Sequence, residues 1–539
     1  MRTATQDNGG GRPGDCALPG QASADRHLAG ALLGLEGVEV IDVEPGGDAT
    51  RVAHVITAGD VPRVCPRCGV PSRRPKETVC TTPRDVLLGQ TRLVLRWHKQ
   101  RWWCDNPACA AQTFTETVPQ IGPGRRLTAR MRAVMGEAIG EQLLPVSEVA
   151  RSYGVAWHTA HDAFVALADA TLGECHPEDD CPTDDPGSGD GDGAVIPDAA
   201  PDLREQGAAP AACGPAAAGE GESEADHDGD DEAAGPVLPL VSVLGIDDTR
   251  RGKRRLRRDP DTGGWVQLAD QWQTGFVDIS GDAGLLGQTP GRAGRDVVRW
   301  CSAQPQCWRE AVQVVAIDLS GAYRSGIRTA LPHARVAADP FHVVQLANKM
   351  VAQVRRRETA QRYRRRGRRG DPEYVVKRLL MRNAEDLPPV ALAKMWNTLT
   401  EAGEHGQRIL GAYIAKEKIR DVLALSPART HVTPAPSQIR HRLGEFFTWC
   451  ATFDDIPEIA TFAETISRWR HEIATAVRTG VSNAKSEGVN RIVKLVARIA
   501  YGFRNPLNQR RRVRYAATRT GRRKQSLPVS TRQPLSVIT

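Results

Sequence analysis

The segment 312–344 reads VQVVAIDLSGAYRSGIRTALPHARVAADPFHVV, a strand, helix and strand pattern at the centre of the chain. Its first apolar run, 312–317, predicts a buried strand that ends at Asp318. A second apolar run, 334–338, predicts another buried strand, which ends at Asp339. We therefore expect two neighbouring strands to bring one carboxylate each to the same edge of a sheet.

A third apolar run, 240–246, precedes Asp247 and Asp248. Turns favour Asp at strand ends, so any one of these residues alone has an ordinary structural explanation. Carboxylates that meet from three strands suggest a functional explanation instead, because Mg²⁺ prefers oxygen ligands and keeps positions open for phosphate oxygens. The set of strand-end carboxylates therefore predicts a divalent cation site.

The order of the predicted elements indicates the fold class. Residues 237–347 predict three strands, a helix, a strand, a helix and a strand, which is the order of an RNase H-like mixed sheet. Residues 348–480 carry helical periodicity and predict an all-helical insertion, after which 481–513 supplies the final helix of the core. The chain as a whole is expected to be a multidomain α/β protein.

The helix predicted in 481–513 carries a further carboxylate, Glu487. Apolar residues form one helical stripe at Val489, Ile492, Val493, Val496 and Ile499. Glu487 lies off this stripe, on the face that carries the cations Arg491, Lys494 and Arg498. A metal ligand beside phosphate-binding groups would show this pattern, whereas a merely solvated helix more often alternates its charges. Asp339 competes with Glu487 as third ligand, but its place near His342 also suits a group that orients another ligand.

An arginine-rich run, RRRETAQRYRRRGRRG, occupies 355–370 with nine Arg in sixteen residues. Charge runs are usually solvated faces. This density favours contacts with DNA phosphates instead. The residues predicted to make them are Arg355, Arg356, Arg357, Arg364, Arg365 and Arg366.

Four cysteines near the N-terminus have the spacing of a structural zinc site. Cys65 and Cys68 form a Cys-x₂-Cys turn closed by Gly, and Cys104 and Cys109 form a second turn after an intervening strand region. Two ligands from each turn match a closed tetrahedral Zn²⁺ site with no open position for catalysis. Cys80 and His98 compete as ligands, but neither sits in a tight turn beside a second one. Residues 28–118 are thus expected to form a β-rich zinc-binding domain.

A helix-turn-helix is predicted in 125–173, from PVSEVARSYGVAWHTAHDAF. Gly154 can adopt the left-handed conformation between the two helices, and apolar residues continue on one face of both. The second helix would expose Trp157, His158 and His161 toward a DNA major groove. An ordinary helical hairpin has the same pattern, but the neighbouring zinc module and cationic sequence favour DNA binding.

Charge is distributed unevenly over the 539 residues, which carry 72 Lys and Arg against 64 Asp and Glu. The segment from His176 to Glu232 holds eighteen acids and one Arg, a local charge of −17 within a total of +8, so the remainder carries +25. A polyanionic partner is therefore expected. Residues 1–27 and 174–236 have compositions typical of disorder, the latter as an acidic linker, and 514–539 reads as a basic tail.

Several classes of protein are disfavoured by missing patterns. The sequence has no apolar run of about 18 residues and no secretory signal pattern, so we expect no membrane association. Its twelve Cys are then expected to be reduced thiols and metal ligands rather than disulfides. The phosphate-binding pattern GxxxxGK[ST] is absent, which disfavours nucleotide-driven chemistry.

One family combines these features in the same order. The motifs CPRCG, WWCDNPACAAQTFTE, the helix-turn-helix, GIDD, AIDLSGAYR, DPFHVV, MRNAEDL, SNAKSEGVNRIVK and AYGFRNPLNQRRR run through 36–513, and the set resembles the ISL-three family of insertion-sequence transposases. The resemblance implies a DDE-type transposase whose RNase H-like core holds two divalent ions, Mg²⁺ or Mn²⁺, for attack on phosphodiesters. By motif, the catalytic residues and magnesium ligands would be Asp247, Asp318 and Glu487, with Asp339 and His342 as ancillary groups.

The same resemblance implies the partners. The expected substrates are double-stranded DNA at the terminal inverted repeats and target DNA, bound by a homo-oligomer, most simply a dimer, in the cytoplasm at the nucleoid. An inactive relative acting as a DNA-binding regulator would need only the zinc module and the helix-turn-helix. Carboxylates at all three positions argue against that alternative. A nuclease with the same metal site but no strand joining is a third possibility.

Overall fold

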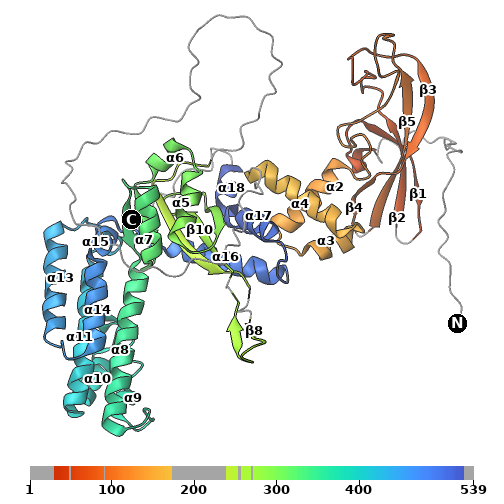
Figure 1. The fold of residues 1–539 in the computed structure, drawn as a ribbon. Helices are drawn as coiled ribbons and strands as arrows, with labels where there is room; N and C mark the ends of the chain where they lie inside the picture. Colours follow the sequence, from red (N-terminus) through yellow and green to blue (C-terminus); the bar gives the residue numbers. More distant parts are fainter. Residues whose placement is uncertain are drawn as a thin grey trace, which may run out of the picture. The chain divides into compact units, whose positions relative to one another are not determined.

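A computed structural model describes residues 30–47, 50–89, 91–172, 238–252, 256–268 and 271–526. The disorder predicted for 1–27 and 174–236 lies outside these residues. The chain divides into two compact units, Met1–Glu174 and Cys175–Thr539, which are described separately (Figure 1).

The first unit begins with a six-stranded sheet built around the long strand β5. β2 pairs with β5 in parallel, and β3, β4 and β6 pair with it antiparallel. The core of this sheet is formed by alternate residues of β5, because Leu93, Leu95 and Trp97 point to one face and are almost fully buried. The strands are β1 (Val38–Pro45), β2 (Thr50–Thr57), β3 (Pro75–Thr81), β4 (Arg84–Leu88), β5 (Thr91–Trp103) and β6 (Thr113–Thr115).

The helices α2 (Ala129–Gly140), α3 (Val146–Tyr153) and α4 (Trp157–Leu172) complete the first unit. A buried ion pair between Asp85 of β4 and Arg130 of α2 joins sheet and helices. Thr128 strengthens this junction, since its hydroxyl caps α2 and also donates to Asp85 at 2.6 Å. Both features fix how α2 leaves the sheet.

The second unit is organised around a five-stranded mixed sheet with the order β11-β10-β7-β12-β13. β10 pairs antiparallel with both β11 and β7, whereas β7, β12 and β13 run parallel. The strands are β7 (Val243–Arg250), β10 (Trp272–Asp278), β11 (Leu285–Pro290), β12 (Val314–Ile317) and β13 (Arg335–Ala338). Every residue of β12 is buried, as expected for a central parallel strand covered on both faces.

One strand is longer than predicted. The apolar run 240–246 was expected to end before Asp247 and Asp248, but β7 continues through both residues to Arg250. The reason is its antiparallel neighbour, because β10 pairs Gly275 with Asp247 and Thr274 with Asp248. Parallel pairing with β12 ends earlier, at Gly245.

Helices pack closely on the mixed sheet and on each other. The helices α5 (Gly294–Ser302), α6 (Gln306–Ala311) and α7 (Gly321–Ala330) precede and follow β12 (Figure 1). α5 and α7 cross where Gly294 meets Gly326, and a Cβ added at Gly326 would lie 2.5 Å from the carbonyl oxygen of Gly294. Only glycine therefore allows this close crossing.

A helical bundle follows β13, as predicted for the insertion. α8 (Pro340–Tyr363) starts at the end of β13 and continues without a break into the bundle, so one helix connects the sheet to it (Figure 1). Buried residues of α11 (Glu404–Ala424) form much of the bundle core, including Lys416, whose ammonium donates to the carbonyl of Leu380 at 3.1 Å. Further helices of the bundle are α10 (Pro389–Glu401), α13 (Pro436–Ala451), α14 (Pro457–Arg468) and α15 (Arg470–Thr479).

The chain then returns to the sheet through α16 (Ala484–Ile499), followed by α17 (Pro506–Ala517) and α18 (Arg519–Ser526). α16 packs against β7 and β10, and α17 packs against β11. Of the predicted basic tail, residues 514–517 and 519–526 are helical, and Tyr515 is buried. Within the described part of the chain, no helix combines the length and the apolar character needed to span a membrane.

Candidate active site

Five side chains meet at one edge of the mixed sheet. Asp247 comes from β7, Asp318 follows β12, and Asp339 follows β13. His342 lies in the first turn of α8, and Glu487 lies in the first turn of α16. The carboxyl ends of parallel strands lie at the same sheet edge, which explains why segments far apart in sequence supply one site.

His342 lies between three of the carboxylates. Its Nε2 is 2.9 Å from Asp318 Oδ1, 3.9 Å from Asp339 Oδ2 and 3.9 Å from Glu487 Oε1. The contact with Asp318 raises the pKa of His342 above its ordinary value, although burial of the imidazole opposes this. The imidazole thus lies close to carboxylates that come from three different parts of the fold.

Asp318, Asp339 and His342 each offer a ligand atom within 4.8 Å of the others, a spacing that can hold a metal ion. Asp339 Oδ2 is buried and has no hydrogen-bond donor among the described residues, whereas Asp318 Oδ1, also buried, lies 2.9 Å from His342 Nε2. Buried carboxylate oxygens without donors are what a divalent cation would satisfy. The residues present therefore fit a hard metal ion.

Asp247 stands beside this group rather than within it. The amide of Asn490 donates to Asp247 Oδ2 at 2.7 Å, and the backbone N–H of Asp248 donates to Asp247 Oδ1 at 2.8 Å. Burial and the nearby charge of Asp318 together raise the pKa of Asp247 to about 7. A cation bound between these carboxylates would oppose this rise, because it favours their charged forms.

Asp339 also contacts the backbone at the start of α16. It is 2% exposed, and its Oδ1 accepts the backbone N–H of Asn483 at 3.1 Å. Burial raises its pKa. Because Asn483 immediately precedes α16, Asp339 fixes the start of the helix that carries Glu487.

A polar stripe on α16, which the sequence prediction missed, holds this helix on β7. Asn483 donates to the carbonyl of Ile246 at 3.1 Å, and Asn490 contacts Thr249 as well as Asp247. The signal was present in the sequence, since Asn483, Ser486 and Asn490 are spaced by three and four residues and share a helix face. These polar contacts, together with buried Val489, Val493 and Val496, orient Glu487.

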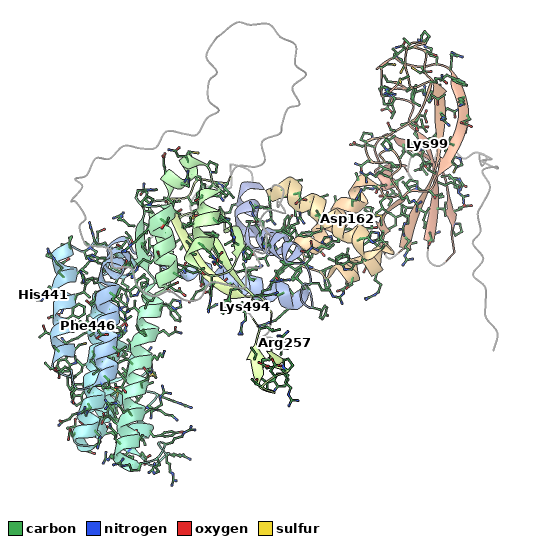
Figure 2. The ribbon with its side chains drawn as sticks, viewed as in Figure 1. Lys99, Asp162, Arg257, His441, Phe446 and Lys494 are labelled. Carbon is green, nitrogen blue, oxygen red and sulfur yellow. The ribbon has the colours of Figure 1, made fainter. Side chains whose placement is uncertain are left out.

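The cations predicted on α16 are exposed, whereas Glu487 is 33% exposed at its side chain. Figure 2 shows Lys494 on the surface near the sheet. A cavity of about 360 Å³ opens next to the carboxylates and is lined by Asp318, Leu319, Ser320, His342, Gln345, Leu346 and Lys349. The carboxylates thus lie next to open space, and the helix that carries Glu487 also carries exposed cations. The exposed α16 cations are Arg491, Lys494 and Arg498.

The arginine-rich run is divided between two roles. Arg357 makes a bidentate contact with Glu458 of α14 at 2.9 and 3.0 Å, and Arg365 makes one with Asp371 at 2.7 and 2.8 Å. The Arg357 contact joins α8 to α14, whereas the Arg365 contact is local and orders the turn that follows α8. Arg355 is partly buried, whereas Arg356, Arg364 and Arg366 are exposed and available to a polyanion.

The four predicted cysteines converge in the first unit. Their sulfurs lie within 4.8 Å of one another, with Cys65 and Cys109 4.0 Å apart and Cys68 and Cys104 3.5 Å apart. A tetrahedral zinc with Zn–S bonds of about 2.3 Å places its sulfurs roughly 3.8 Å apart. The backbone N–H of Arg67 is the main cause that lowers the pKa of Cys65 to about 7, whereas the pKa values of Cys104 and Cys109 are raised, chiefly by burial and the neighbouring thiols. The cluster therefore fits zinc.

The competing ligands lie elsewhere on the same sheet. Cys80 of β3 pairs with His98 of β5. The His98 ring stacks on His54 with 5.3 Å between centroids. Neither Cys80 nor His98 belongs to the four-sulfur cluster.

The helix-turn-helix forms as predicted. α3 ends at Gly154, whose φ of 63° is left-handed, and α4 begins at Trp157. The Trp157 ring is half exposed and stacks on His161 with centroids 4.8 Å apart. His158 is exposed, whereas His161 is only partly so.

Comparisons with known proteins agree on one class. A family model described as "Transposase" (DDE_Tnp_ISL3) matches residues 265–513, and the "Helix-turn-helix domain of transposase family ISL3" matches residues 116–168. The transposase for insertion sequence element IS1001 of Bordetella parapertussis is 23% identical over 487 residues, which are 89% of this chain and 95% of that protein.

Two further comparisons cover a smaller share of this chain. The transposase for insertion sequence element IS1557 of Mycobacterium tuberculosis is 30% identical over 196 residues, which are 32% of this chain and 41% of the relative. Among solved structures, the Drosophila P element transposase strand transfer complex aligns with a TM-score of 0.28 and 9% identity over 51% of this chain and 75% of that chain. That structural similarity is too weak to bear on the fold.

Proposed function

The chain belongs to the ISL3 family of DDE-type DNA transposases, and on this premise we propose that it cleaves and joins DNA at the terminal inverted repeats of an insertion sequence. The observation that carries the proposal is the meeting of Asp247, Asp318, Asp339, His342 and Glu487 at one sheet edge. Phosphoryl transfer needs mainly positioned metal ions and charge neutralisation, and no covalent protein nucleophile. This set of side chains supplies both requirements.

The core is proposed to be RNase H-like. Support comes from the strand order β11-β10-β7-β12-β13, with an antiparallel first half and a parallel second half. The helical bundle between β13 and α16 would then be an insertion in this core. Its boundaries are proposed at 237–347 for the first part, 348–480 for the insertion and 481–513 for the final helix.

The metal ligands are proposed to be Asp247, Asp318 and Glu487. Mg²⁺ or Mn²⁺, when bound, supplies Lewis-acid stabilisation of the attacking and leaving oxygens. Asp247 and Asp318 would hold it from the sheet, and Glu487 is partly exposed, so it remains accessible from the substrate side. Asp339 is proposed to have mainly a positioning role, because its Oδ1 already accepts the backbone N–H of Asn483 at the start of α16, which leaves only Oδ2 to face a metal. His342 would orient Asp318.

Zn²⁺ is proposed to be structural and bound by Cys65, Cys68, Cys104 and Cys109. Four thiolates leave no open coordination position, so this metal would stabilise the turns rather than take part in the reaction. The sulfur spacings described above support this assignment.

DNA is proposed to be bound in two ways. α4 would read the terminal repeat through Trp157, His158 and His161, as a recognition helix does in the major groove. Phosphates would be held by the exposed arginines of 355–366 and by the α16 cations, which provide affinity for any sequence. Joining both ends of an element is simplest with a homodimer on DNA, acting in the cytoplasm at the nucleoid.

The test uses a labelled duplex that carries the end of the element, recovered by sequencing the DNA around the gene. With Mg²⁺, the proposed transposase should cleave this duplex and join its 3′ end to target DNA. Cleavage without joining would identify a nuclease, and binding without cleavage would identify a regulator. Asp318→Asn serves as the control, because it should bind the duplex without cleaving it.

A further inference from the structure

A small hairpin protrudes from the mixed sheet and has no role in the function proposed so far. β8 (Leu256–Arg258) and β9 (Trp265–Gln267) pair antiparallel with each other and form a separate two-stranded sheet. We call residues 256–268 the β8–β9 arm. Figure 1 shows the arm leaving the sheet as a short ribbon, and Figure 2 labels Arg257 on it.

The arm starts at the carboxylate edge of the sheet. It is inserted between β7 and β10, whose last paired residues are Arg250 and Trp272. Asp247 pairs with Gly275 only three positions away, which is about 10 Å along a strand. DNA that reaches the carboxylates therefore passes near the base of the arm.

The base of the arm is anchored and cationic. The Arg251 guanidinium donates to Gln509 Oε1 at 2.8 Å and to the carbonyl of Arg504 at 3.0 Å. The Arg292 guanidinium lies over the Trp272 ring, 4.5 Å from its centroid. The arm thus rises from a fixed, positively charged platform.

The tip of the arm is preformed. Asp259 accepts the backbone N–H groups of Asp261 at 2.9 Å and of Thr262 at 3.2 Å. Its own N–H donates to the carbonyl of Gly264 at 2.8 Å, and Gly263 adopts a left-handed φ of 66°. An ordered turn holds the two strands in register and lowers the entropy cost of binding.

The side chains of the arm combine arginines with exposed apolar groups. Trp265 is 70% exposed and Leu256 is 54% exposed. Arg258 pairs with Trp265 across the strands, so both share a face with Leu256, whereas Arg257 shares the other face with Val266. A two-stranded hairpin is marginally stable alone in water, and exposed Trp on such a ribbon indicates that a partner covers it.

Charge decides the kind of partner. Arg257 and Arg258 are exposed. The sequence that leads into and forms the first strand of the arm, 250–258, reads RRGKRRLRR, and its seven cations outnumber Asp259 and Asp261 at the tip. A second copy of this cationic region would be repelled, whereas a nucleic acid is attracted. Two-stranded ribbons fit DNA grooves, and aromatic side chains stack on bases or wedge between them.

We propose that the β8–β9 arm grips the DNA next to the phosphodiester held at the carboxylates, with Trp265 against the bases and Arg257 and Arg258 on phosphates. The proposal rests on the proposed DNA cleavage function, because the position of the arm matters only if DNA occupies the carboxylate edge. It assigns a binding site for bases next to the cleavage point.

The experiment uses the full-length protein and an element-end duplex with 2-aminopurine at successive positions around the cleavage point, in Ca²⁺ to hold the duplex uncleaved. Trp265 should unstack one of these positions and raise its fluorescence upon binding. Trp265→Ala should abolish that rise and weaken binding about tenfold. Trp396→Ala is the matched control, since Trp396 is 43% exposed on α10 and should leave the rise intact.

The arginines give an independent readout. Replacing both Arg257 and Arg258 by Ala should lower the slope of log K against log salt by roughly two, one for each lost phosphate contact. A circular dichroism spectrum and unfolding temperature matching the wild type would show that the variants fold. Trp265→Phe keeps an aromatic ring, so it should show part of the 2-aminopurine fluorescence rise that Trp265→Ala loses.

Two results would overturn the proposal. One is an unchanged 2-aminopurine signal and affinity in Trp265→Ala. The other is a shift in the oligomeric state of DNA-free Trp265→Ala, which would make the arm a protein interface. A failed cleavage function would look different, because the wild-type protein would then give the fluorescence rise in Ca²⁺ but no cut strand in Mg²⁺.

Discussion

Replacing Gly245 by Ala is expected to push α16 away from the sheet and to disable the active site. A Cβ on residue 245 would come closest to Ser486 Oγ and would lie 2.7 Å from Ile279 Cδ1 and 2.9 Å from Asn483 Oδ1. Carbon contacts are optimal at about 3.5–4.0 Å, so α16 has to move. Overpacking of this kind costs roughly 1–3 kcal/mol of folding stability.

The same movement would displace Glu487 and the amide of Asn490 that holds Asp247. A misplacement of about 1 Å at a catalytic group can cost about 100-fold in rate. We therefore expect Gly245→Ala to lower the cleavage rate about 100-fold while the protein remains folded. Cleavage rate and urea unfolding, measured on the same preparation, separate the two effects.

A second substitution tests the geometric cause. Ser486 is 1% exposed, and no hydrogen bond to its Oγ is found among the described residues, so Ser486→Ala alone should change little. Combined with Gly245→Ala, it removes the closest clash and should restore part of the stability and rate. If Gly245→Ala cleaved and unfolded like the wild type, α16 would not be packed on β7 as described.

Three further predictions concern other parts of the chain. The purified protein should hold about one structural Zn²⁺ per chain, and Cys104→Ser should lose it while the catalytic unit stays folded; metal analysis that finds no zinc in reduced wild-type protein would refute this. Neutralising Arg356, Arg364 and Arg366 should flatten the salt dependence of binding to any duplex, whereas changes at Trp157, His158 and His161 should lower the preference for the terminal repeat; identical phenotypes would disprove this division. The contact with Arg365 lowers the pKa of Asp371 to about 2, so the stabilisation is present above pH about 4 and is lost as the pH falls toward 2; Asp371→Asn should flatten the unfolding profile in that window, and an unchanged profile would contradict it.

Local patterns were sufficient to predict much of the fold. The apolar runs before Asp318 and Asp339 are β12 and β13, and Gly154 takes the left-handed turn of the helix-turn-helix. The paired cysteine turns also converge as their spacing implied. Each of these predictions depends on a single turn, a single strand or two short motifs. None of them requires knowledge of a contact with a residue elsewhere in the chain.

The missed features depend on distant partners. β7 is longer than its apolar run because β10 pairs with it across the arm. Arg357 lies in the arginine-rich run, but its ion-pair partner is Glu458, about a hundred residues downstream. The role of Asn490 depends on Asp247, 243 residues earlier. Sequence spacing carries no information on such contacts.

The most direct test of the proposed active site compares four substitutions in one Mg²⁺ cleavage assay on the element-end duplex. Asp247→Asn, Asp318→Asn and Glu487→Gln should each abolish cleavage and leave DNA binding near normal, because each removes a charge from the metal site at nearly constant volume. Asp339→Asn should lower activity less, or act through stability, since its carboxylate holds the start of α16. Normal cleavage by Glu487→Gln, together with a folded but inactive Asp339→Asn, would make Asp339 the third ligand and would contradict the assignment.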